Sequence, residues 1–420
     1  MKNIMDFGAV PDGVTLNTAA IQKAIDAAAA AGGGQVRIPA GVFLTGTLRL
    51  RDRIDLHLEP GAVLLASPDP ADYNALDEYP QNWSCPREGW QGIHLILAIG
   101  LKDVSITGRG IIDGNGERFY PPPRENIPPR NNYAWSYGFR MDKNLTRPGQ
   151  LMVFCECRNI LVSGVTLRNA SCWCCYLLGC QDAVIDGLIV RNPPDFANTD
   201  GIDIDCCRNV MISNCNIDTG DDAITLRGSE KHLGYEFPCE NITVTNCILA
   251  SSVCGFRIGV GSGTIRNAAI SNIVIRRSGI GLLLQSAYSP GSGVDIYDLT
   301  VSGIRFDQTA HPVRICAGFP DTTAQIHHIA FTNLHGNCYA NIAVIGQKAA
   351  RPHDISFEQC SFHVVKSPFR LAEQKDYPSF FLAVESADRI STREFSWRQD
   401  EDSLPFWNLP PGPAPETAGA

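Results

Sequence analysis

Three aspartates stand in two short polar segments whose side chains could do acid–base chemistry. Asp200 lies directly before the β-like run 201–205, and the pair Asp221 and Asp222 follows the run 210–217. If the chain makes one coil between the two segments, they stack on neighbouring rungs about 4.8 Å apart at the backbone. Carboxyl groups gathered in this way can protonate a leaving oxygen and activate a water, which is what glycosidic-bond hydrolysis needs. The pattern therefore predicts a carboxylate site with these aspartates as its catalytic residues.

The elements that must position these aspartates recur along the chain. Short β-like runs repeat at a spacing of roughly 25 residues, within the range typical of stacked solenoid coils. Turn residues, and no segments of helical period, separate the runs, which favours a β-solenoid over alternating strands and helices. Asparagine opens several units, and either a stacked side-chain ladder or the turn preference of asparagine explains it. The units open at 103–106, 159–162, 183–185, 209–212, 241–244, 268–270, 294–299, 326–331 and 354–357.

The two ends of the chain and two internal segments depart from this repeat. Near the start, Asn17 is the expected N-cap of a helix that ends at Gly32 to Gly34, and its apolar face comprises Ile21, Ala24, Ile25 and Ala28. Long loops are expected at 73–91 and 117–147, where aromatic residues would line a cleft or pack over the coils. We expect one domain over residues 1–365. Residues 366–420 are expected to be a non-repetitive extension and tail, which could cap the coils or mediate a homo-oligomer.

Composition and charge exclude several classes of partner and indicate a cellular compartment. The net charge of −9 argues against nucleic acid as a partner. No apolar run approaches 18 residues, so no membrane span is expected. The 16 cysteines include no matched pair of CxxC motifs, which argues against a zinc site and favours buried thiols in a reducing compartment. The first residues do not resemble a signal peptide, so the expected location is cytoplasmic.

Two motifs add a family resemblance to this pattern. The segments NTDGID (198–203) and GDDAI (220–224) resemble the active-site signatures of glycoside hydrolase family 28, the polygalacturonases and their relatives. The opening segment DFGAVPDGVTLNTAAIQKAI resembles the N-terminal cap of pectin-degrading β-helix proteins, and 149–173 resembles the family's approach to its site. The resemblance implies an all-β fold, a single-stranded right-handed parallel β-helix with a short N-terminal helical cap.

The resemblance also implies roles for the acidic residues and no cofactor or metal. Asp221 would be the general acid of an inverting reaction, and Asp200 and Asp222 would hold and deprotonate the attacking water. Inversion normally separates acid from base by roughly 6.5–9.5 Å. Crowding of like charges would raise the pKa of one carboxyl group. Asn198 would orient Asp200 or a sugar hydroxyl.

The sequence departs from the family pattern where the substrate carboxylate would be bound. Cys254 stands at the position of a histidine, and Arg257 at that of a serine. The segment Leu283-Leu284-Gln285 replaces an Arg-Ile-Lys triplet, so two cations are lost. Arg227 and Arg257 are either a relocated anion clamp or ordinary solvated residues of the rim. The candidate substrate-binding residues are Asn198, Trp173, Arg227, Arg257 and Gln285.

The sequence thus predicts an inverting glycoside hydrolase, exo-acting on pectin-derived oligosaccharides or related plant glycosides. A polysaccharide lyase and a non-catalytic carbohydrate-binding solenoid are the alternatives. Asp203, Asp205 and Asp218 are expected to bind their own turns or calcium instead of taking part in catalysis.

Overall fold

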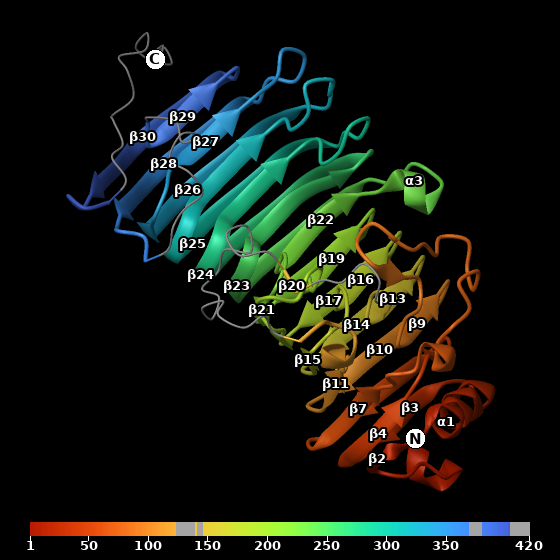
Figure 1. The fold of residues 1–420 in the computed structure, drawn as a ribbon. Helices are drawn as coiled ribbons and strands as arrows, with labels where there is room; N and C mark the ends of the chain where they lie inside the picture. The colour runs from red at the N-terminus through yellow and green to blue at the C-terminus, as the bar shows by residue number, and fades with distance from the viewer. Residues whose placement is uncertain (123–138, 141–145, 369–379, 404–420) are drawn as a thin grey trace.

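The chain winds into a single stack of parallel coils, which runs from the N-terminal end to the C-terminal end of the molecule (Figure 1). The computed structural model describes residues 1–122, 139–140, 146–368 and 380–403. All ladder pairings between its named strands are parallel, and each coil pairs with the coil before and after it. The predicted single-stranded right-handed parallel β-helix is confirmed.

Three stacks of strands form the sides of the coils. The first comprises β1 (Lys2–Asn3), β3 (Gly34–Ile38), β6 (Ile54–Leu58), β10 (Lys102–Gly108), β14 (Arg158–Ser163), β17 (Gln181–Asp186), β20 (Arg208–Ser213), β26 (Ile326–Cys338), β28 (His353–Val364) and β30 (Asp388–Gln399). The second comprises β2 (Asp12–Leu16), β4 (Gly41–Thr45), β7 (Ala62–Ala66), β11 (Ile111–Asp113), β15 (Thr166–Arg168), β18 (Ile189–Arg191) and β21 (Asn216–Thr219). The third comprises β5 (Leu48–Arg49), β9 (Ile96–Ile99), β13 (Met152–Cys155), β16 (Cys175–Leu178), β19 (Ile202–Asp205), β22 (Ile224–Gly228), β27 (Ile342–Ile345) and β29 (Leu382–Glu385).

In the described part of the chain, β26, β28 and β30 continue from the first stack into the second, and three longer strands continue through all three stacks. The three longer strands are β23 (Cys239–Gly261), β24 (Thr264–Gln285) and β25 (Asp295–Cys316). A separate two-stranded sheet joins β8 (Trp90–Gln91) to β12 (Arg147–Pro148). Within the described residues, the helices are α1 (Thr18–Ala30) and α3 (Glu230–Leu233), with single 3₁₀ turns η1 (Ile4–Phe7), η2 (Pro70–Asp72) and η3 (Gly116–Arg118).

The core lies inside the coils and follows the two-residue alternation of strands. In β6 and β7, buried and partly exposed positions alternate, so every second side chain points inward. Inward side chains then stack from coil to coil, as Ala183, Val210 and Ile242 do in neighbouring strands. Full burial of such an aliphatic side chain stabilises the fold by about 1.5–3 kcal/mol.

Cysteines occupy inward positions at one corner of the coils. Cys157, Cys180, Cys207 and Cys239 are buried and recur on successive coils. The backbone N–H of Cys180 donates to Cys207 Sγ at 3.3 Å. All 16 cysteines are free thiols. These side chains act as small buried apolar groups that also accept hydrogen bonds from the turn.

Both explanations offered for the recurring asparagines hold. Asn209, Asn241 and Asn267 adopt the left-handed conformation, with φ of 57°, 59° and 50°, which asparagine tolerates better than most residues. Asn241 Nδ2 also donates to Asn209 Oδ1 at 2.9 Å, and Asn267 Nδ2 donates to Asn241 Oδ1 at 2.6 Å. The side chains therefore form a ladder along one edge of the solenoid.

The N-terminal cap is the helix α1, and the predicted apolar face is buried. Asn17 precedes α1, but its side chain makes no capping hydrogen bond, contrary to our expectation. Its Oδ1 accepts from the N–H of Val10 at 2.6 Å, and its Nδ2 donates to the carbonyl of Thr15 at 2.6 Å. Asn17 thus ties the preceding loop together instead of capping the helix.

The coils continue beyond residue 365. Strand β29 pairs with β27, and β30 pairs with β28. Residues 380–399 are therefore a further coil, whereas the tail 404–420 and most of the 117–147 loop lie outside the described residues. None of the helices in the described ranges has the length and apolar character needed to cross a membrane.

Candidate active site

One coil separates the two acidic segments, as predicted. Ile202 of β19 pairs with Ile224 of β22, and the N–H of Gly201 donates to the carbonyl of Asp222 at 2.9 Å. The run expected at 210–217 is two strands, β20 and β21, because Asn214 between them is left-handed, with φ of 57°. This corner turns the chain back, so that Asp200 and Asp222 lie on adjacent rungs.

Glycines allow the two rungs to approach this closely. A Cβ atom on Gly220 would lie 2.2 Å from the carbonyl oxygen of Phe196. A Cβ atom on Gly201 would lie 2.4 Å from the carbonyl oxygen of Ala223. A larger residue at either position would push the acidic segments apart.

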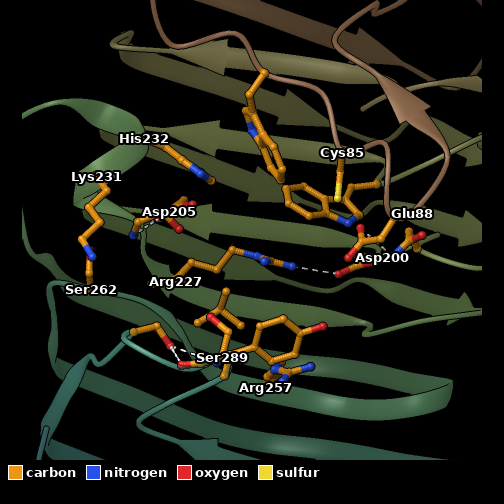
Figure 2. A pocket seen from close by; sticks show the side chains of 18 of the residues that line it. Cys85, Glu88, Asp200, Asp205, Arg227, Lys231, His232, Arg257, Ser262 and Ser289 are labelled. Atoms are coloured by element: carbon orange, nitrogen blue, oxygen red, sulfur yellow. Dashed lines mark hydrogen bonds and ion pairs between the residues drawn. The ribbon is translucent and has the colours of Figure 1, made fainter. Parts of the chain in front are cut away.

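The three predicted catalytic aspartates converge. One carboxylate oxygen from each of Asp200, Asp221 and Asp222 lies within 4.8 Å of the other two. Asp200 and Asp222 are buried, and all three line a cavity of about 360 Å³ (Figure 2). The walls also include part of the 73–91 loop, part of the helix α3 and two turns, 260–262 and 288–292; the loop contributes Trp83, Cys85, Arg87 and Glu88, and α3 contributes Lys231 and His232.

Asp221 is poised to act as an acid. Burial, followed by the neighbouring charge of Asp222, raises the pKa of Asp221 to about 7. The N–H of Asn198 opposes this shift by donating to Asp221 Oδ2 at 3.1 Å. The carboxyl group therefore holds its proton up to neutral pH, as a general acid must.

Asp200 and Asp222 each have one oxygen fixed and one free. Arg227 Nη2 donates to Asp200 Oδ2 at 3.0 Å, and Arg257 Nη1 donates to Asp222 Oδ2 at 3.1 Å. Their other oxygens are buried and have no hydrogen-bond partner among the described residues. Burial and the nearby Asp203 raise the pKa of Asp200, which Arg227 lowers in part. A buried acceptor without a partner is a place where a water molecule can be held.

The two arginines are buried parts of the site. Arg227 also donates through Nε to Asp203 at 2.7 Å and lies 4.1 Å over the Trp173 ring. Arg257 donates through Nη2 to Gln285 Oε1 at 2.9 Å. Both side chains are about a tenth exposed or less, so the expectation of solvated rim residues is wrong. Both already bind carboxylates of this chain, so neither is an open anion clamp.

Trp173 and Gln285 each contact one of these arginines. Trp173 lines the cavity and packs against Trp90 and Arg227. Gln285 supports Arg257 but is not among the described residues that line the cavity. The sequence predicts both as substrate contacts, and this prediction stays untested for Trp173, which lines the cavity, and for Gln285, which contacts Arg257.

Asn198 contacts Asp221, and among the described residues it has no hydrogen bond to Asp200, whereas the alternative expectation, a contact with a sugar hydroxyl, stays a prediction. It is left-handed, with φ of 56°, and its backbone N–H points at the acid. Its Oδ1 accepts from Arg147 Nη2 at 2.5 Å, and its Nδ2 donates to Glu88 Oε2 at 3.2 Å. The side chain is thus held by two residues that the sequence reading did not select.

Glu88 and Arg147 were missed because their roles depend on distant parts of the chain. Glu88 lies beside Asp200 in the cavity and accepts from Trp90 Nε1 at 3.0 Å (Figure 2). Arg147 is buried and donates to Tyr120 Oη at 2.9 Å and to backbone carbonyls, including that of Glu88. In the sequence, the only feature that could point to Glu88 as a site residue is its position as an acidic residue within an aromatic loop.

The replaced family positions form a small apolar cluster. Cys254 is fully buried and packs with Ile280 and Leu283, which is 6% exposed. The histidine and the arginine expected by resemblance are thus replaced together by groups that fill each other's space. No cation remains at Cys254 or Leu283.

The remaining aspartates have structural partners on other coils. Asp203 pairs with Arg227, and Asp218 pairs with Arg277. Asp205 accepts from the N–H of Ser229 at 2.7 Å and from Tyr176 Oη at 3.1 Å. They therefore bind neighbouring elements, not their own turns. The oxygens of Asp200, Asp221 and Asp222 are close enough to share a cation, although two of the three carboxylates already pair with arginines.

Comparison with known proteins places this geometry in a family. The model of "Glycosyl hydrolases family 28" matches residues 35–369, and that of "Rhamnogalacturonase A/epimerase, pectate lyase-like" matches residues 1–62. A Vitis vinifera protein named "Probable polygalacturonase" is 31% identical over 70% of this chain and 59% of its own length. The "Exo-poly-alpha-D-galacturonosidase" of Dickeya chrysanthemi is 30% identical over 69% of this chain and 53% of its own length.

The fold has solved counterparts. The exopolygalacturonase of Thermotoga maritima superposes with a TM-score of 0.69 at 22% identity, covering 93% of this chain and 91% of that one. This likeness concerns the fold, and the chain spans little more than half the length of the two sequence relatives. Because the family model matches most of the sequence, the chain belongs to glycosyl hydrolases family 28.

Proposed function

We propose that this protein hydrolyses glycosidic bonds of pectin-derived oligosaccharides and releases sugars from a chain end. The observation that carries the proposal is the pairing of a carboxyl group of near-neutral pKa, Asp221, with two carboxylates that each present a free buried oxygen. The names of the Vitis vinifera and Dickeya chrysanthemi relatives support a pectic substrate.

The geometry supports one division of labour. Asp221 protonates the leaving glycosidic oxygen as the bond breaks. A water held by the free oxygens of Asp200 and Asp222 attacks the anomeric carbon and gives its proton to one of them. Arg227 and Arg257 fix the other oxygen of each carboxylate, so the free oxygens stay directed at the water.

The stereochemical course has two candidates. Inversion is typical of carboxyl groups roughly 6.5–9.5 Å apart and retention of groups about 5–5.5 Å apart. In this site, one oxygen from each of the three carboxylates lies within 4.8 Å of the other two, a distance between single oxygen atoms and not between whole carboxyl groups. The free oxygens of both carboxylates favour a bound water and therefore inversion, which the family resemblance also implies. Retention, with a carboxylate as nucleophile, is the alternative that the closeness of these oxygens raises. Proton NMR of the first anomer released separates the two.

A contact between the 73–91 loop and α3 on the cavity wall supports exo-action. Trp83 of the 73–91 loop contacts His232 of α3, with ring centroids 4.6 Å apart, and packs in one cluster with Leu233. The loop thus crosses several coils and meets α3 on the wall of the cavity. A wall that blocks one end of a cleft favours binding of a chain terminus over binding of a chain interior.

The test is product analysis on oligogalacturonides, rhamnogalacturonan fragments and neutral plant glycosides, with Asp221→Asn beside the wild type. Release of a monosaccharide by the wild type alone supports the proposal. Unsaturated products that absorb in the ultraviolet would indicate a lyase instead. Equal binding with no turnover in either protein would indicate a non-catalytic carbohydrate-binding solenoid.

A further inference from the structure

The two family positions whose cations would bind a substrate carboxylate are occupied by Leu283 and Gln285 in this chain, so an acidic sugar needs a different cationic partner. Cys254 and Leu283 are buried against each other. A carboxylate placed against them would be desolvated without a partner, which is strongly unfavourable. Arg227 and Arg257 are already bound to Asp200 and to Asp222.

A cation with no partner of its own lies elsewhere in the same cavity. Lys231 of α3 lines the cavity and has no ion pair or hydrogen bond from its side chain within the described ranges. Figure 2 shows it with Ser262 on the opposite side of the cavity from Asp200. Its ammonium group is therefore available to a ligand bound beside the three aspartates.

The acidic groups near Lys231 are already engaged. Asp205 is buried and accepts from the N–H of Ser229 and from Tyr176 Oη. The carboxylate of Glu230 accepts from the N–H of Phe237 at 2.9 Å. Neither forms an ion pair with Lys231, so a ligand carboxylate does not have to displace one.

Hydroxyl groups complete this end of the cavity. Ser229 and Ser262 line it, and their hydroxyls have no hydrogen-bond partner in the described part of the chain. An ammonium group flanked by hydroxyls binds a carboxylate through charge-assisted hydrogen bonds. The cavity thus has an acidic side that holds the reacting bond and a basic, hydroxyl-bearing side.

We infer that the sugar held in this cavity is a uronate, with its carboxylate bound by Lys231 and the hydroxyls of Ser229 and Ser262. The inference rests on the proposed glycosidase function and adds the chemical class of the sugar. In this chain the residue that binds the substrate carboxylate lies on α3, the helix that follows β22, and not at the family positions on the core strands β23 and β24. Lys231 is a specificity-determining residue, not part of the acid–base machinery.

The experiment compares trigalacturonate with its carboxyl-reduced counterpart, a trigalactoside. Lys231→Met should lower kcat/KM for trigalacturonate about tenfold to hundredfold, the loss expected for a hydrogen bond to a charged group. The trigalactoside should lose less than about twofold, because it offers Lys231 no charge. Lys231→Arg should recover most of the loss, and Lys348→Met, an exposed lysine outside the cavity, is the matched control.

Binding separates failure of the inference from failure of the function. Tryptophan fluorescence of Asp221→Asn, with and without Lys231→Met, is titrated with galacturonate and with galactose. Preference for galacturonate that depends on Lys231 supports the inference even if no substrate is cleaved. Equal losses on both trisaccharides, no loss, or wild-type preference for the neutral sugar would overturn it.

Discussion

Two neighbouring regions of the site share one strand ladder but differ in chemistry. Asp203, Thr225, Arg257 and Leu283 occupy successive positions of β19, β22, β23 and β24. In the first region, Asp203 and Arg257 lie on either side of the uncharged Thr225, and the buried guanidinium groups of Arg227 and Arg257 are each matched to a carboxylate. Leu283 packs with Cys254 and Ile280 and carries no charge, and the next position of the ladder, on β25, is Arg314.

The comparison shows how a site can keep its catalytic carboxylates while the residues that bind the substrate carboxylate change. Charges in the first region form a mutually dependent set, because removing one leaves a buried partner unpaired. The apolar region depends only on filling space, so its residues can be exchanged together. The loss of two expected cations therefore leaves the carboxylate cluster intact.

The largest expected effect comes from the charged region. Asp221→Asn removes the proposed acid, and kcat should fall about 10²–10⁴-fold, the usual contribution of a general acid. In the wild type, activity should decline as pH rises above about 7, because Asp221 then loses its proton. Initial rates from pH 4 to 9 measure both, with Leu283→Ala as a folded control. An unchanged rate would remove Asp221 from the mechanism.

The same substitution should raise stability in alkaline solution. The folded-state pKa of Asp221 is above its unfolded value, so the folded protein binds more protons between about pH 4 and 7 and loses stability as pH rises through this window. Asp221→Asn removes this loss. Urea unfolding should show a gain of about 1–2 kcal/mol at pH 8 and little gain at pH 4. An equal change in the free energy of unfolding at pH 8 and at pH 4 would contradict a raised pKa of Asp221.

Arg257→Met breaks a buried pair and should lower the free energy of unfolding by about 3–5 kcal/mol at neutral pH. The positive charge of Arg257 also lowers the pKa of Asp221, so its removal should move the alkaline decline of activity to higher pH. Urea unfolding and a pH–rate profile measure the two effects. A profile that stays in place would mean that Arg257 does not act on the acid.

Leu283→Ala tests the apolar region in the same way. It should cost about 2–3 kcal/mol of unfolding free energy by opening a cavity beside Cys254. The pH–rate profile should not move, because Leu283 carries no charge. A shifted profile would show that the two regions are coupled through packing, against the independence inferred from their contacts.

The sequence indicated the coils and the three aspartates because both are local patterns. Alternation marked the inward residues, and the two acidic segments stood one coil apart. The arginine pairs could not be read in the same way, since Arg257 meets Asp222 only after the coils stack. Glu88 reaches the site through a loop held by Arg147. The last coil escaped notice because β30 is mostly exposed and rich in charged residues.

The smallest expected effect tests whether Gln285 acts only through Arg257. Gln285→Met removes the acceptor for Arg257 Nη2 and should cost about 1 kcal/mol of unfolding free energy. If Gln285 contacts substrate, the substitution should also lower kcat/KM when Arg257 is already Met. If it only positions the guanidinium, Gln285→Met should change neither stability nor kcat/KM in that background. We expect the second result, because Gln285 lies behind Arg257 and outside the cavity lining of the described chain. That result of the double-mutant cycle would show that Gln285 contributes only by holding Arg257. Arg257 would then be the last functional residue of the charged region, next to the apolar cluster of Leu283.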